Sequence, residues 1–112
     1  MFELRLDEDI FEIVKNGTKR VEIRLLDKKR ELMKVGNILT FYKRPLLEEK
    51  ITTRITRLQS FKTIEDLLNK YEMKEIYIDG FSKEKFITLI SKFYSEEEQE
   101  KYGFVAIEFE VL

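Results

Sequence analysis

The chain has 112 residues, 43% hydrophobic and 38% charged, with a formal net charge of −1 at pH 7, which predicts one folded domain over residues 1–112 and excludes a disordered chain. Cys and His are absent, which excludes a disulfide framework, a thiol nucleophile and the usual zinc ligands, so we expect no metal and no cofactor. No apolar run approaches the roughly 20 residues that span a bilayer, and the first residues do not resemble a signal peptide, so we expect a cytoplasmic protein without membrane contact.

The chain begins with a predicted strand, a helix and a second strand. Apolar and charged residues alternate over 2–6, and Asp7 is placed to cap the helix that follows. Gly17 supplies the end of that helix. The stretch from Thr18 to Leu26 alternates again, which predicts a strand with an apolar face and a charged face that points outward or lines a cleft.

The middle of the chain predicts a hairpin. Residues 27–34 are expected to form a helical turn. Residues 38–43 and 51–58 are rich in Ile, Thr and aromatic residues and read as strands, and Pro45 marks the loop between them.

The second half of the chain is mainly helical. Apolar residues recur at three- and four-residue spacings over 61–71, with Thr63 as the expected cap, and again after Ser82. Ser95 with Glu98 has the pattern of a capping box for a third helical turn. The segment IYIDG (76–80) reads as extended.

The last nine residues, FVAIEFEVL, alternate as a closing strand. About five strands, one early helix and two or three late helices make an α+β domain. We expect a small mixed β-barrel of about five to six strands with flanking helices, which would leave no sheet edge exposed.

Four residues in and just before the second predicted strand carry a family resemblance. Gly17, Lys19, Glu22 and Arg24 match the G-x-K-x-x-E-x-R signature of the ASCH domain family, and the chain resembles this family over nearly its whole length. The segments VGNILTF and YGFVAIEF are also similar to family patterns, although Asn37 stands where an acidic residue is common. The resemblance implies a PUA-like barrel with a cleft beside the signature strand, and RNA, a nucleotide or a nucleoside as the partner.

A bacterial branch of this family hydrolyses acetylcytidine nucleosides with a Lys, a Thr three residues further on, and a Glu before a late helix. By resemblance Lys19 matches the Lys, Glu22 stands at the Thr position, and Asp79 falls near the Glu when Tyr94 sets the alignment. The missing Thr argues against the same hydrolytic mechanism. On the residues alone, the pattern favours Asp79 as a turn residue before Gly80.

The expected ligand contacts gather on the signature strand and the hairpin, within the basic half of the chain: residues 1–62 hold 15 Lys and Arg against 10 Asp and Glu. Arg24 would grip a phosphate or base edge while Glu22 orients it. The alternative is a solvated ladder of opposite charges, with Lys19 extending to water. The full set of expected contacts is Gly17, Thr18, Lys19, Arg20, Glu22, Arg24, Lys43, Arg44 and Arg54.

Two functions therefore stay open. The first is a binding domain for RNA or a nucleotide that uses the cleft beside the signature strand. The alternative is a small amidohydrolase acting on acylated cytidine nucleosides, or an RNA-processing enzyme. In that case Glu22 or Asp79 would activate water and Lys19 would stabilise the developing negative charge.

Overall fold

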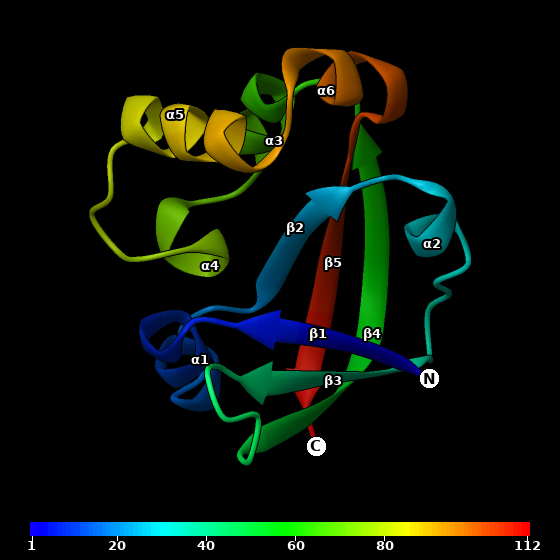
Figure 1. Ribbon diagram of the computed structural model, residues 1–112, viewed down its shortest axis with the longest axis vertical. Coiled ribbons are helices and arrows are strands. Elements are labelled where there is room, and N and C mark those ends of the chain that lie inside the picture. The colour runs from blue at the N-terminus through cyan, green and yellow to red at the C-terminus, as the bar shows by residue number, and fades with distance from the viewer.

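The computed structural model describes all 112 residues and arranges them as one five-stranded sheet with six helices around it (Figure 1). In chain order the elements are β1 (Phe2–Leu6), α1 (Glu8–Lys15), β2 (Val21–Leu25), α2 (Lys28–Glu31), β3 (Ile38–Lys43), β4 (Lys50–Phe61), α3 (Ile64–Lys70), α4 (Met73–Ile76), α5 (Lys83–Phe93), α6 (Glu96–Tyr102) and β5 (Phe104–Val111). None of the helices is long and apolar enough to cross a membrane.

The sheet is mixed and curls into a half-barrel. Its strand order is β1-β3-β4-β5-β2, with β1 and β3 parallel and every other pair antiparallel. β4 is 12 residues long and pairs with both β3 and β5, and an irregularity between Ile55 and Arg57 bends it. The predicted α+β fold, a small mixed barrel with flanking helices, is confirmed in this form. The expectation that no edge remains is wrong, because β1 and β2 end the sheet as unpaired edges.

Two hydrophobic clusters lie on opposite faces of β5. Val105, Ile107 and Phe109 belong to the cluster inside the half-barrel, which α1 covers, whereas Phe104 and Ala106 belong to the cluster under the later helices. Burial of the second cluster holds α3, α4 and α5 against β2 and β5. These helices therefore form a wall beside the seam between the edge strands.

The second strand is shorter than predicted. β2 begins at Val21 rather than Thr18, because the backbone N–H groups of Thr18 and Lys19 both donate to the carbonyl of Ile13, at 3.1 and 3.0 Å. These bonds tie the turn after α1 to the helix. Gly17 has a φ of +85° in this turn, so its predicted role as the helix end is confirmed.

Most of the predicted helix caps are confirmed, whereas the predicted conformation of residues 76–80 is not. Ser82 and Ser95 accept the expected capping hydrogen bonds, whereas Asp7 stands at the N-cap of α1 without making one. The extended segment predicted at 76–80 is wrong. Ile76 ends α4 and the following residues form bends and a turn, because Glu75 accepts from the backbone N–H of Glu72 at 2.9 Å and favours a helical turn there.

Candidate functional site

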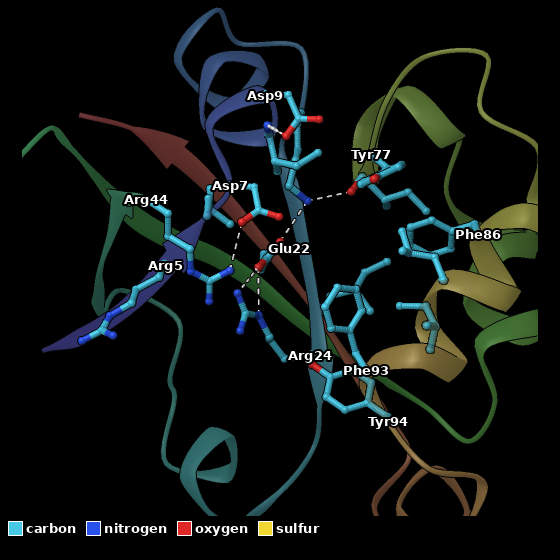
Figure 2. Close-up of a pocket in the computed structure, with 17 residues that line it drawn as sticks. Arg5, Asp7, Asp9, Glu22, Arg24, Arg44, Tyr77, Phe86, Phe93 and Tyr94 are labelled. Atoms are coloured by element: carbon cyan, nitrogen blue, oxygen red, sulfur yellow. Dashed lines mark hydrogen bonds and ion pairs between the residues drawn. The ribbon is translucent and has the colours of Figure 1, made fainter. Parts of the chain in front are cut away.

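The seam between β1 and β2 opens into a pocket of about 260 Å³ (Figure 2). We name it the seam pocket. Its floor contains Lys19 and Glu22, and its polar side contains Arg5, Asp7, Arg24 and Arg44. Its apolar side is formed by α4, α5 and the residues after each, and includes Ile76, Tyr77, Phe86, Phe93 and Tyr94.

Lys19 lies at the floor with only 2% of its side chain exposed. Its Nζ donates to the backbone carbonyls of Val21 and Ile76, both at 2.6 Å, and lies 3.0 Å from Oε1 of Glu22. Burial lowers the pKa of Lys19, and the charge of Glu22 opposes this. Three acceptors match the three donors of an ammonium group, so Lys19 has no donor left for a ligand. The alternative that Lys19 extends to water is wrong.

Glu22 is shared between two cations. Its Oε1 faces Lys19, and its Oε2 lies 2.8 Å from Nη2 of Arg24 and accepts from Nε of Arg24 at 2.9 Å. Burial by itself would raise the pKa of Glu22, but the charges of Lys19 and Arg24 outweigh it and lower the pKa to about 2. Glu22 is therefore ionised at neutral pH, and the alternative of a solvated ladder does not describe this buried group.

Arg24 is the most exposed member of this group at the pocket. Its side chain is 20% exposed, and only Nε and Nη2 are engaged by Glu22. Burial alone would lower the pKa of Arg24, but Glu22 raises it. The guanidinium is therefore permanently charged, fixed in orientation, and has Nη1 free for a ligand.

Aromatic side chains face these charges across the pocket (Figure 2). The rings of Tyr77 and Phe86 contact each other at 5.4 Å between centroids, with their planes tilted by 58°. Phe93 is 65% exposed, so its ring is accessible to a ligand at the pocket. Burial raises the pKa of Tyr94, with Arg24 opposing, so its hydroxyl is a neutral hydrogen-bond donor at pH 7.

The other signature-strand residues lie beside the pocket rather than in it. Gly17 and Thr18 form the turn that delivers Lys19, and Thr18 donates from its backbone to Asn16 Oδ1 at 2.9 Å. Arg20 is exposed and its Nε donates to the carbonyl of Gly17 at 3.1 Å. None of these three residues lines the seam pocket.

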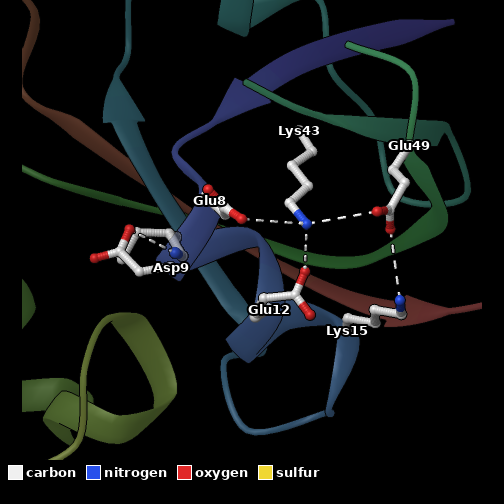
Figure 3. Close-up of polar contacts among 7 residues, drawn as sticks. Glu8, Asp9, Glu12, Lys15, Lys43 and Glu49 are labelled. Carbon is white, nitrogen blue, oxygen red and sulfur yellow. Dashed lines mark hydrogen bonds and ion pairs between the residues drawn. The ribbon is translucent and has the colours of Figure 1, made fainter. Parts of the chain in front are cut away.

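The hairpin cations are separated by the fold. Lys43 lies among three carboxylates, with its Nζ 3.0 Å from Glu12, 3.5 Å from Glu49 and 3.8 Å from Glu8 (Figure 3). Arg44 lines the seam pocket and pairs with Asp7 at 3.1 Å. Arg54 is exposed on β4 and lines no part of the pocket.

Asp79 is exposed in the turn before α5 and does not line the pocket. The structure therefore does not bring it together with Lys19 and Glu22. No group of three or more potential metal ligands gathers on the chain.

Sequence reasoning missed Arg5, Phe93 and Tyr94 as site residues. The helical spacing of Phe93 with Phe86 and Ile90 favours a position in the core instead. The alternation of β1 put Arg5 on the polar face, but nothing in the sequence places β1 opposite β2.

Comparison with known proteins identifies the family. The family model of the ASCH domain matches residues 4–112. The chain belongs to the ASCH domain family. The predicted resemblance is thereby confirmed, and in this ASCH domain the signature residues Lys19, Glu22 and Arg24 form the buried charged group at the floor of the seam pocket.

Solved structures of similar chains support the same assignment. PF0455 from Pyrococcus furiosus is 31% identical with a TM-score of 0.79, over 99% of this chain and 96% of that one. The hypothetical protein PH0355 is 28% identical with a TM-score of 0.83, over 99% and 98%. A serine-to-alanine mutant of ZmASCH from Zymomonas mobilis is 12% identical with a TM-score of 0.68, over 96% of this chain and 66% of that one, and shares the fold. A comparison with curated proteins finds no match.

Proposed function

We propose that this ASCH domain binds one nucleotide unit, free or within RNA, in the seam pocket. The observation that carries the proposal is the position of the exposed ring of Phe93 at a pocket that also holds the fixed guanidinium of Arg24. Proteins recognise unpaired bases by stacking them on aromatic rings and by hydrogen bonds to their edges, with cations for the phosphates. At about 260 Å³ the pocket is slightly smaller than the roughly 300–1,000 Å³ of pockets for drug-sized ligands, so it suits a small ligand such as a single base.

Arg24 is the proposed ligand contact within the signature, and Lys19 and Glu22 are positioning residues. Glu22 uses both of its oxygens on cations, and Lys19 uses all three of its donors within the chain. Their role is to hold Arg24 in one orientation before the ligand arrives, which reduces the entropy lost on binding. Arg44 contributes a second cation at the pocket.

The alternative function, hydrolysis of an acylated cytidine, has weaker support. A general base works best when its pKa lies near the working pH, whereas the pKa of Glu22 is about 2. Lys19 has no free donor to stabilise negative charge on a substrate, and Asp79 lies outside the pocket. Incubation of concentrated protein with acetylcytidine tests it, and release of acetate that stops in Glu22→Gln would support it.

An NMR amide titration tests the binding proposal. Labelled protein is titrated with cytidine, acetylcytidine and short single-stranded RNAs, and we expect shifts on residues 19–24 and 89–94. Phe93→Ala should weaken binding about tenfold, because base–aromatic stacking contributes about 1–3 kcal/mol. Since Phe93 is 65% exposed, the variant should keep its fold.

Leu46→Ala is the matched control, because Leu46 is 74% exposed and does not line the seam pocket. It should bind like the unmodified protein. If no ligand shifts residues around the seam pocket, or if Phe93→Ala and Leu46→Ala behave alike, base binding in this pocket is wrong.

A further inference from the structure

A second, shallower depression adjoins the seam pocket. It has a volume of about 560 Å³ and is predominantly polar. We name it the basic shelf and define it by its charged and aromatic lining, Glu3, Arg5, Arg24, Lys29, Tyr42 and Arg44.

The two depressions share three arginines. Arg5, Arg24 and Arg44 line both the seam pocket and the basic shelf. A ligand that follows this row of arginines therefore passes from the aromatic wall of one depression onto the open surface of the other. A strand of nucleotides has this form, with a base at one position and a phosphate next to it.

The basic shelf carries excess positive charge. Four cations and one carboxylate line it, and two of the cations are already paired, Arg24 with Glu22 and Arg44 with Asp7. Arg5 and Lys29 form no ion pair with any carboxylate of the chain. Two unpaired cations in one depression are suited to an anion.

A hydroxyl donor lies beside these cations. Tyr42 pairs in register with Arg5 across the β1–β3 ladder, so that the two side chains leave the sheet from adjacent positions. The charge of Glu3, together with a hydrogen bond to its carboxylate, raises the pKa of Tyr42. The phenol therefore stays protonated, and it would have to leave Glu3 to donate to a ligand. The basic shelf thus offers guanidinium, ammonium and hydroxyl donors, as phosphate sites commonly do.

We propose that the basic shelf binds the phosphodiester group that joins the nucleotide in the seam pocket to its neighbour, so that the preferred ligand is an RNA strand of two or more nucleotides. This inference rests on the proposed function of the seam pocket. It assigns Arg5, Lys29 and Tyr42 as further ligand contacts. It also predicts that a free nucleoside uses only part of the site.

A pair of variants separates the two depressions. Lys29 lines only the basic shelf, and Phe93 lines only the seam pocket. The ligands are cytidine, its 3′- and 5′-monophosphates, the dinucleotide CpC and inorganic phosphate, each titrated calorimetrically at low and moderate salt. Lys28→Ala is the matched control, because Lys28 is the exposed neighbour of Lys29 on α2 and lines neither depression.

We expect CpC to bind several-fold tighter than cytidine and either monophosphate. Lys29→Ala should weaken the binding of CpC about threefold or more and leave the affinity for cytidine unchanged. It should also reduce the slope of log affinity against log salt by about 0.7. Phe93→Ala should lower the affinity for both ligands, and Lys28→Ala should lower the affinity for neither. Inorganic phosphate should not displace CpC when the two are present at equal concentrations.

The failures are distinguishable. If cytidine binds and depends on Phe93, but CpC binds no tighter or ignores Lys29→Ala, the basic shelf is not a phosphate site and the proposed function stands. If a monophosphate binds with the same affinity as CpC, and Lys29→Ala weakens the two equally, the basic shelf binds the phosphate of a single nucleotide. The inference of a strand is then overturned. If neither cytidine nor CpC binds, the proposed function itself fails.

Discussion

Lys19 and Glu22 form an ion pair that is almost completely removed from solvent. Nζ of Lys19 lies 3.0 Å from Oε1 of Glu22, and their side chains are 2% and 7% exposed. Because both charges have lost water, each depends on the other and on its remaining hydrogen-bond partners. The same carboxylate holds Arg24, so one buried Glu is shared by two cations and the group of three keeps a net charge of +1 beside the pocket.

Replacing Glu22 should therefore be costly. Glu22→Gln keeps the shape of the side chain but leaves Lys19 and Arg24 without their counter-charge. We expect the free energy of unfolding to fall by about 3 kcal/mol or more, measured by urea denaturation at neutral pH. Glu110→Gln is the control at an exposed position and should change stability by less than about 0.5 kcal/mol. Equal effects of the two variants would show that the buried pair adds nothing.

The same carboxylate predicts a pH dependence of stability. Burial would raise the pKa of Glu22, but Lys19 and Arg24 lower it from 4.5 to about 2, so the unfolded chain binds a proton at this position more readily than the folded protein. The stabilisation is therefore complete above about pH 5 and is lost as the pH falls toward 2, and it is on the order of 3 kcal/mol.

Urea denaturation between these pH values checks this prediction. The difference in free energy of unfolding between the unmodified protein and Glu22→Gln should shrink steadily with acidification. A difference that does not change with pH would mean that Glu22 keeps an ordinary pKa in the folded protein.

Lys43 provides a test of which basic residues contact the ligand. The hydrogen bond to Glu12 and the nearby charges raise the pKa of Lys43, and Glu8, Glu12 and Glu49 neutralise its charge. We expect Lys43→Gln to leave the affinity for CpC within about twofold, measured by the same calorimetry, because a neutralised cation releases few counterions. A loss as large as that of Lys29→Ala would instead support the sequence-based prediction that Lys43 contacts RNA.

Gly103 is expected to tolerate no side chain. Its φ is +65°, and a Cβ atom there would lie 2.7 Å from the carbonyl oxygen of Phe61. Gly103→Ala should lower the free energy of unfolding by about 2 kcal/mol or more, seen as a reduced Tm. Gly80→Ala is the control, because Gly80 has a φ of +80° but open space around it. Equal losses of stability in the two variants would mean that the contact between the added Cβ atom and Phe61 is relieved at no cost in free energy.

The sequence by itself determined the features that depend on neighbours along the chain. The alternation of β1 and β5 and the composition of β3 predicted strands. Thr63, Ser82 and Ser95 predicted helix starts, and the spacing from Gly17 to Arg24 predicted the family. These patterns are readable because a cap, a pleat or a turn is formed by residues a few positions apart. Where a local pattern was overlooked, as with Glu72 and Glu75 before Ile76, the prediction was wrong.

The tertiary structure alone decided which residues meet at the site. Lys19 is buried because the carbonyl of Ile76, 57 positions away, accepts its hydrogen bond, and the alternation of β2 contains no trace of that contact. Phe93 is exposed because α5 packs through Phe86 and Ile90 instead. The pocket exists because curling of the sheet brings the edges β1 and β2 to one seam. Contacts between distant segments are set by the packing of whole elements, which residue spacing does not encode.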